Sequence, residues 1–248
     1  MVTLNENFRQ KEGSMIAANA ASIKKGESPT NDNNSDFIII TEDSPTRIHK
    51  RLLELLTEEL PQKLNIKAKE IQVVTPQKDG PLGAKQLNID IQEAVNHDSP
   101  GLKHGMKFFR LGDRVMQTSN SSEKKTYNGE TGWVSEINPE EEWIEVTFHD
   151  GKKSKYGKRE LKELSLAYAT TVHKLQGSET DYMVMPMTMS HKPMLYRNLL
   201  YTGVSRAKKM CVLVGEEKAI KTAIDNPSPS VRNSNFKKRL QENLPAII

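Results

Sequence analysis

The spacing of apolar residues changes along the chain, and each change predicts a different kind of element. Continuous apolar runs at residues 37–41, 71–75 and 210–214 are typical of strands buried on both faces. Between such runs, apolar residues recur every three or four positions, as in the stripe Ile48, Leu52, Leu55, Leu56 and Leu60. Strands that alternate with amphipathic helices favour an α/β fold built on a parallel sheet.

Local signals place the helix ends. Ser44 and Pro45 predict the start of the helix that carries this stripe, because proline is tolerated at the first helical position. Gly26 is a plausible stop for an earlier helix. We expect further helices at residues 14–23, 84–95, 198–206 and 216–224.

The pattern differs between residues 108 and 164. Short alternating segments at 112–118, 132–137, 143–148 and 152–156 are separated by turn pairs such as Asn128-Gly129 and Asp150-Gly151. Closely spaced hairpins of this size predict a small β-barrel inserted into the α/β fold. The insert is basic, which is typical either of a solvated face or of phosphate contacts; its basic residues are Lys124, Lys125, Lys152, Lys153, Lys155, Lys158 and Arg159.

Candidate chemistry begins at residues 166–181. The pattern predicts a strand at 166–169 and then one short helix that ends at Gly177, with Thr170 or Thr171 as its cap. A strand that leads directly into a helix is a common ligand site in α/β proteins. A solvated polar turn is the alternative, but the polar groups there suit phosphate, base or ribose: His173, Lys174, Gln176, Ser178 and Glu179.

A second polar stretch follows at residues 198–209. Asn198, Thr202, Ser205 and Arg206 are spaced to share one helical face. Gly203 inside this helix costs ~1 kcal/mol relative to alanine, so we expect a close contact there. The planar guanidinium of Arg206 suits phosphate, although a lone surface arginine is the simpler reading.

The two stretches together resemble known motifs. Thr-Val-His-Lys-Leu-Gln-Gly-Ser-Glu (171–179) and Leu-Tyr-Thr-Gly-Val-Ser-Arg-Ala-Lys-Lys (200–209) are similar to motifs V and VI of superfamily 1 helicases, in particular the RecD-like DNA helicases related to the exonuclease V alpha subunit. The resemblance implies a RecA-like parallel sheet of the P-loop NTPase type with an inserted SH3-like barrel. The sequence contains no Gly-x-x-x-x-Gly-Lys-[Ser/Thr].

The resemblance therefore covers the C-terminal motor half, beginning just after motif III. It implies that ATP with Mg²⁺ binds only with a P-loop RecA-like domain of the same parent chain, and that the present chain alone does not hydrolyse ATP. Asn-Phe-Arg-Gln (7–10) resembles motif IV. By this resemblance Arg9 and Arg206 act on the γ-phosphate, and Gly177 and Glu179 complete the ATP site, with Glu179 on the ribose.

The same resemblance implies a single-stranded DNA partner and 5′-to-3′ travel. The segment that begins at residue 73 and the turn at 128–132 are similar to family segments, and cleft closure would move motif V along the strand. The DNA-contacting residues that follow are Thr75, Lys78, Asn88, Asn128, Thr171, His173 and Lys174.

Composition changes this picture little. The net charge of +4, from 36 basic and 32 acidic residues, permits a nucleic-acid partner without demanding one. The single cysteine, Cys211, lies in an apolar run and excludes a disulfide framework. No apolar run reaches the ~20 residues of a membrane span, and no signal pattern opens the chain, so a cytoplasmic location without a membrane or metal site is expected.

The predicted organisation has five parts: an N-terminal segment (1–34), the two halves of the motor domain (35–110 and 165–225), the inserted barrel (111–164) and a tail (226–248). Two other functions stay open. One is a single-stranded nucleic-acid-binding module that acts without ATP through the basic barrel. The other is a regulatory remnant that binds a partner protein.

Overall fold

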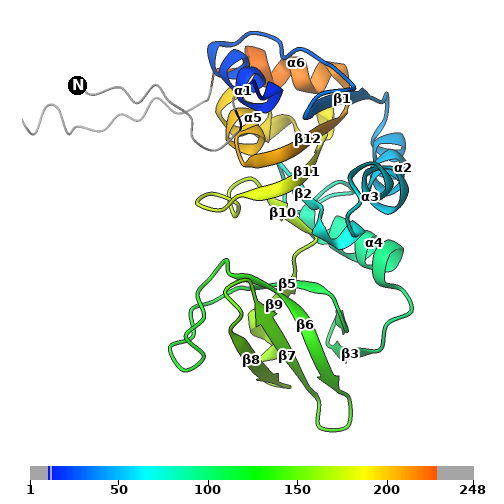
Figure 1. Cartoon of the computed structure of the whole chain (residues 1–248), viewed down its shortest axis with the longest axis vertical. Coiled ribbons are helices and arrows are strands. Elements are labelled where there is room, and N and C mark those ends of the chain that lie inside the picture. The colour runs from blue at the N-terminus through cyan, green and yellow to red at the C-terminus, as the bar shows by residue number, and fades with distance from the viewer. Residues whose placement is uncertain (1–10, 12, 228–248) are drawn as a thin grey trace, which may run out of the picture.

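The computed structural model describes residue 11 and residues 13–227. It contains two lobes, stacked along the long axis in Figure 1. We call residues 13–96 and 169–225 the α/β lobe and residues 101–166 the β lobe. The chain leaves the α/β lobe after α4 (Ala84–Asn96) and returns to it at β10 (Ala169–Thr171), so the β lobe is an insertion.

The α/β lobe is built on five strands in the order β1-β12-β11-β2-β10, all parallel. Their bounds are β1 Phe37–Thr41, β12 Ala207–Gly215, β11 Thr180–Met187 and β2 Gln72–Thr75, with β10 as one edge. Successive side chains of a strand point to opposite faces. Accordingly Met183 and Met185 enter one hydrophobic core, whereas Val184 enters the other.

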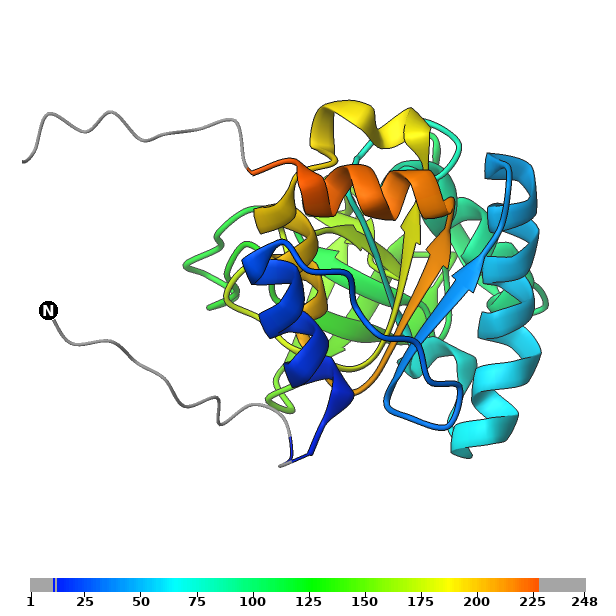
Figure 2. The same cartoon turned by 90° about the horizontal axis from the view of Figure 1, so that it is seen from above.

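Helices cover both faces of this sheet, as Figure 2 shows. One face packs against α1 (Met15–Lys25), α5 (Arg197–Val204) and α6 (Glu217–Asp225). The other packs against α4 and a long helix that runs from α2 (Pro45–Glu54) through a π-helical segment (Leu55–Glu59) into α3 (Leu60–Leu64). The predicted RecA-like parallel sheet flanked by helices is confirmed.

The helix ends follow the sequence signals. The hydroxyls of Ser14 and Ser44 accept hydrogen bonds from the first turns of α1 and α2, and Pro45 occupies the first turn of α2. Gly26 ends α1 with φ of 88°, a left-handed conformation that glycine adopts without strain. The carboxylate of Asp36 also accepts from the N–H of Met15 at 2.8 Å, which joins α1 to the start of β1.

The β lobe contains a hairpin and an antiparallel sheet. The hairpin pairs β3 (Gly101–His104) with β4 (Lys107–Arg110). The sheet has the order β8-β7-β6-β5-β9, with bounds Lys153–Gly157, Trp143–Phe148, Thr131–Asn138, Arg114–Gln117 and Leu164–Leu166. Alternate residues such as Val134, Ile144 and Tyr156 form its core. Among the described residues, the edge strands β8 and β9 do not pair, so hydrogen bonds do not close the sheet into a ring.

Two predicted elements were wrong in detail. The strand expected at 166–169 is two short strands: β9 belongs to the β lobe, and β10 belongs to the parallel sheet. The chain passes between the lobes at Ala167 and Tyr168, and both residues are buried. The short helix expected before Gly177 is a succession of turns. In the described part of the chain, no helix has the length and apolar character needed to cross a membrane.

Candidate functional site

The strands of the parallel sheet all begin at one end of the sheet, which we call its amino-terminal edge, and finish at the other, its carboxyl-terminal edge. The amino-terminal edge brings the two polar stretches together. Thr180 of β11 and Ala207 of β12 are register partners, so the residues that precede them lie side by side. The Thr180 N–H donates to the Arg206 carbonyl at 3.0 Å, and Arg206 Nη1 donates to the Ser178 carbonyl at 3.5 Å. Glu179, next to Ser178, forms an ion pair with Lys208 at 2.6 Å.

Arg206 retains hydrogen-bonding capacity at this edge. Its Nε is buried without a hydrogen-bond partner among the described residues. A buried donor without a partner is costly, so this group is suited to an acceptor brought from outside the lobe. Arg9, the second arginine predicted for this site, lies outside the described residues.

Glycines give this edge its shape. Gly177 has φ of 89°, and a Cβ built there would meet nothing within 4 Å, so the position requires glycine for its backbone conformation. At Gly203, a Cβ would lie 2.9 Å from the Met185 sulfur, which accounts for the close contact expected inside α5. The face expected to carry four polar residues is divided, because Asn198 is exposed whereas the Ser205 hydroxyl donates to the Thr202 carbonyl.

The carboxyl-terminal edge of the same sheet carries a second set of predicted residues. Thr171 of β10 is the register partner of Thr75 of β2, so the loops that follow these strands leave the sheet at neighbouring points. The Thr171 hydroxyl accepts from the Lys174 N–H at 3.4 Å, as a cap does, but it begins a series of turns and not the predicted helix. Lys78, His173 and Lys174 are exposed there.

Two residues predicted to touch DNA point inward instead. Thr75 is fully buried, and its hydroxyl donates to the Leu82 carbonyl at 2.7 Å. Asn88 is 9% exposed; its amide donates to the Ala169 carbonyl at 2.8 Å and accepts from the Ala169 N–H at 3.0 Å. Both side chains fix the edge and its loops but do not form its surface.

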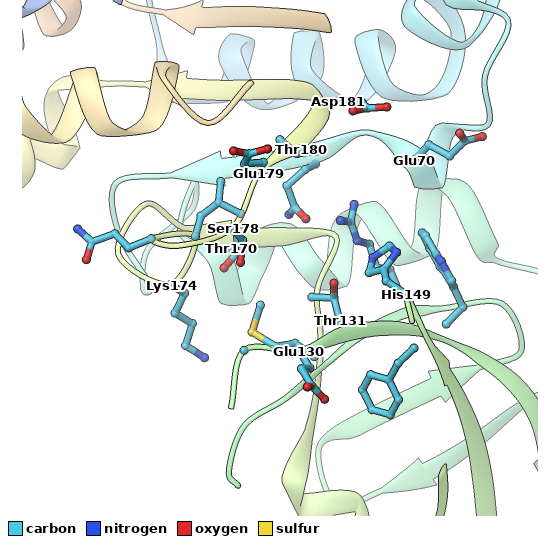
Figure 3. Close-up of a pocket in the computed structure, with 18 of the residues that line it drawn as sticks. Glu70, Glu130, Thr131, His149, Thr170, Lys174, Ser178, Glu179, Thr180 and Asp181 are labelled. Carbon is cyan, nitrogen blue, oxygen red and sulfur yellow. The ribbon is translucent and has the colours of Figure 1, made fainter. Parts of the chain in front are cut away.

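Asn128 lies on the β lobe, outside the parallel sheet. Its backbone N–H donates to the Asn120 side chain at 2.8 Å. It lines a cavity of about 690 Å³ between the lobes, together with Lys174 and Glu179. Figure 3 shows Lys174 and Glu179 approaching this cavity from the α/β lobe, and Glu130 and His149 from the β lobe.

Arg114 is the most buried cation of this cavity. It is 8% exposed, its guanidinium lies 5.5 Å from the ring centre of Trp133, and its Nε has no hydrogen-bond partner among the described residues. Burial lowers the pKa of Arg114 to about 10, so it remains charged at neutral pH. Burial and the nearby Arg114 also lower the pKa of His149. The sequence pattern did not single out Arg114; the available signal was a basic residue inside a buried strand.

The acids around the cavity are largely paired with lysines. Asp181 pairs with Lys209 at 2.6 Å, and Glu130 pairs with Lys152 at 3.3 Å. Within the described ranges, no group of three or more His, Cys, Asp or Glu side chains is arranged to hold a metal ion.

The basic residues of the β lobe are mostly engaged. Lys155 lies 3.5 Å from the ring centre of Trp143. Ion pairs between exposed groups contribute only ~0–1 kcal/mol, but they reduce the charge presented to a polyanion. The pairs are Lys124–Glu160, Lys152–Glu130, Lys153–Glu145 and Lys158–Glu142, at 2.5, 3.3, 2.9 and 2.6 Å.

Comparisons with known proteins agree with this architecture. Residues 166–214 match the UvrD-like helicase C-terminal domain, and residues 87–148 match the ATP-dependent RecD-like DNA helicase SH3 domain. The two matches together span residues 87–214 and correspond to a helicase C-terminal domain with an SH3 domain. The second match is specific to RecD-like helicases, and the predicted resemblance to that group is confirmed.

Curated relatives support the same assignment. The ATP-dependent RecD2 DNA helicase of Deinococcus radiodurans is 37% identical over 149 residues, which are 60% of this chain and 20% of that protein. The RecBCD enzyme subunit RecD of Mycobacterium tuberculosis is 30% identical over 172 residues, 69% of this chain and 29% of that protein. The chain therefore spans less than a third of the length of these relatives.

Solved structures share the fold at low sequence identity. A Bacteroides Pif1 helicase in complex with ADP-AlF3 and single-stranded DNA has a TM-score of 0.59 and 18% identity, with 98% of this chain and 57% of that chain covered. This likeness extends over both lobes, so the placement of the β lobe within the α/β fold has a known counterpart.

Proposed function

We propose that this chain is the second motor domain, with its SH3 domain, of an ATP-dependent helicase that moves on single-stranded DNA. The arrangement of one rigid sheet supports this function. Glu179 and Arg206 lie at its amino-terminal edge, and Lys78, Thr171 and His173 lie at its carboxyl-terminal edge. Because both edges belong to one sheet, a displacement of the domain caused by the nucleotide at the first edge also displaces the DNA-binding residues at the second.

The amino-terminal edge supplies charge to a nucleotide held by a separate P-loop domain. When bound there, ATP with Mg²⁺ supplies the phosphoryl group that is transferred to water. Arg206 offers a fixed positive charge and an unpartnered Nε. A single arginine in this role contributes ~10³ to 10⁵ in rate. Arg9 is the proposed second arginine, and Glu179, now paired with Lys208, would accept from the ribose.

The carboxyl-terminal edge supplies the DNA contacts. Lys78, His173 and Lys174 are exposed on two neighbouring loops, and backbone groups and short hydroxyls such as Thr171 suit phosphate oxygens. Asn128 would contact the strand from the β lobe. The resemblance to RecD-like helicases is the basis for 5′-to-3′ travel. The relatives named for ATP-dependent helicase activity and the Pif1 complex with single-stranded DNA support this choice of partner.

DNA binding can be tested on the chain itself. Fluorescence anisotropy with a labelled oligo(dT) should show binding that weakens as salt rises, because cations released from phosphates drive association. Lys78→Ala with Lys174→Ala should weaken binding and reduce the salt slope by about 2. Lys221→Ala, an exposed lysine of α6, is the matched charge control. Equal losses in both variants would contradict the proposed DNA edge.

The role of Arg206 requires a P-loop domain. We suggest a chimera in which this chain replaces the matching region of the Deinococcus radiodurans relative. Arg206→Ala in the chimera should abolish DNA-stimulated ATP hydrolysis and leave oligo(dT) binding nearly intact. Lys221→Ala should leave both unchanged. Normal turnover by the Arg206→Ala chimera would exclude Arg206 from the reaction.

The alternative function is ATP-independent binding of single-stranded nucleic acid by the β lobe. The ion pairs on that lobe disfavour it, because four of its lysines already face carboxylates. This alternative predicts that Lys155→Ala with Arg159→Ala removes oligo(dT) binding and that the Lys78 and Lys174 substitutions do not. The anisotropy experiment therefore distinguishes the two functions.

A further inference from the structure

Helix α4 carries three amide side chains at intervals of four residues: Asn88, Gln92 and Asn96. Residues four apart lie on one helical face. All three amides form hydrogen bonds with residues outside the helix, either in the turn between β4 and β5 of the β lobe or where the chain returns to the α/β lobe. This row of amides on α4 is called the amide row below.

The first of these segments is the turn between β4 and β5. Gln92 Nε2 donates to the Phe108 carbonyl at 2.8 Å. Asn96 Nδ2 donates to the Leu111 carbonyl at 3.1 Å and to Asp113 Oδ1 at 2.7 Å. Gln92 also forms a hydrogen bond with the Asp113 carboxylate. Two amides of one helix therefore hold the turn between β4 and β5.

The return passage is held by the same elements. The Tyr168 hydroxyl donates to Asp113 Oδ1 at 2.8 Å, and Asn88 pairs with both backbone groups of Ala169. From β2, Gln72 Nε2 donates to the carbonyls of Ala167 and Tyr168 at 3.2 and 2.9 Å. The β4–β5 turn and the return passage are thus both connected to α4, and the Asp113 carboxylate joins the two.

Asp113 is the centre of this network. It is fully buried, and it also accepts from the Arg110 N–H at 2.6 Å, which makes four donors in all. Burial raises the pKa of Asp113, and the four hydrogen bonds oppose that rise. A buried network in which every group has a partner favours one arrangement of the chain over others.

The backbone at the start of α4 contacts the loop that carries Lys78. The Lys85 N–H at the start of α4 donates to the Lys78 carbonyl at 3.0 Å, and the Ala84 N–H donates to the Gln77 carbonyl at 3.0 Å. The loop that carries Lys78 is therefore hydrogen-bonded to the helix whose side chains hold the β lobe.

We propose that Asp113 and the amide row are positioning residues that fix the β lobe to α4 and β10, so that the two lobes move as one body. The importance of this coupling for DNA movement rests on the proposed function, but the coupling itself does not. One consequence is that the cavity between the lobes keeps a constant width while the α/β lobe moves.

Distances between the lobes, measured by double electron–electron resonance, test the proposal. Spin labels at Lys218→Cys in α6 and Glu140→Cys in the turn after β6 report the separation, since both positions are exposed. The native Cys211 is fully buried and should remain unlabelled. The unmodified network should give one narrow distance distribution.

Gln92→Ala with Asn96→Ala should broaden this distribution at least twofold. Gln86→Ala is the matched control, because Gln86 is exposed on the same helix and its amide donates to Asp90, one turn further along that helix. An unchanged width in the folded double variant would overturn the proposal. If circular dichroism shows that the double variant is unfolded, Tyr168→Phe, which removes one hydroxyl, decides instead: a broader distribution supports the coupling and an unchanged one overturns it.

The measurement uses neither DNA nor ATP, so its outcome is independent of the proposed function. A rigid pair of lobes in a chain that does not bind oligo(dT) would leave the coupling intact and remove only its connection to DNA movement.

Discussion

Replacing Asn88 by alanine separates a structural role from a DNA-binding role at one position. β10 is an edge strand of the parallel sheet and pairs with β2 alone among the described strands; the N–H and C=O of Ala169 point away from β2. The Asn88 amide pairs with both groups at 3.0 and 2.8 Å, as a neighbouring strand would. Asn88→Ala removes these bonds at a site from which water is largely excluded.

The magnitude follows from the groups left without partners. A buried donor or acceptor without a partner costs about 1–3 kcal/mol. Asn88→Ala leaves two such groups on Ala169, which together amount to about 2–6 kcal/mol. Part of this cost is recovered where water enters beside α4, and we therefore expect a loss of about 3 kcal/mol in the free energy of unfolding.

Urea denaturation followed by circular dichroism measures this loss as a lower midpoint at an unchanged slope. Oligo(dT) anisotropy on the folded variant should give an affinity close to that of the parent. Lys78→Ala should show the reverse pattern, since its side chain is exposed. If Asn88→Ala weakens DNA binding while the unfolding free energy stays within about 0.5 kcal/mol, the side chain contacts DNA and the reasoning from burial is wrong.

Three further predictions concern single positions. Burial lowers the pKa of His191 to about 4, so the unfolded chain takes up a proton at a higher pH than the folded chain does. The unfolding free energy should therefore fall by about 2 kcal/mol between pH 7 and pH 5. His191→Gln should remove this dependence in urea titrations at the two pH values. Gly203→Ala should lower the unfolding free energy by about 1–3 kcal/mol because the added methyl meets the Met185 sulfur, whereas Gly157→Ala, with its nearest contact at 3.7 Å, should cost less than 1 kcal/mol in the same assay. Burial raises the pKa of the Cys211 thiol and keeps reagents away from it. A maleimide should therefore modify this thiol only as fast as the chain unfolds, and rapid labelling of the native chain would contradict the described core.

The sequence alone was sufficient for the elements whose signals are local. The strand expected at 37–41 is β1 without change, and Ser44 with Pro45 marked the start of α2. Such elements are predictable because a capping hydroxyl, a proline or an apolar run acts within a few residues.

The interior polar contacts were not predictable from local patterns. Asn88, Gln92 and Asn96 have the polar spacing of a solvated helical face, yet their partners lie as many as 81 residues away. The division of residues 164–171 into two strands was missed for the same reason. Leu164 and Ala169 are both buried apolar residues, and only the tertiary fold assigns them to different sheets.

Where a residue lies relative to its strand separates two groups of predicted site residues. One group remains available to a ligand, and the other forms hydrogen bonds inside the protein. Glu179 and Arg206 precede strands, and His173 and Lys174 follow one, so their side chains lie beyond the ladder of backbone hydrogen bonds. Thr75 is the last residue of β2, and its hydroxyl bonds to the loop, while Asn88 faces a strand edge from a helix. In a parallel sheet flanked by helices, a polar group inside these layers must satisfy the protein first. The groups available to an external partner are those just beyond the strand ends, and the two ends of this sheet are therefore where ATP and DNA contacts should be sought.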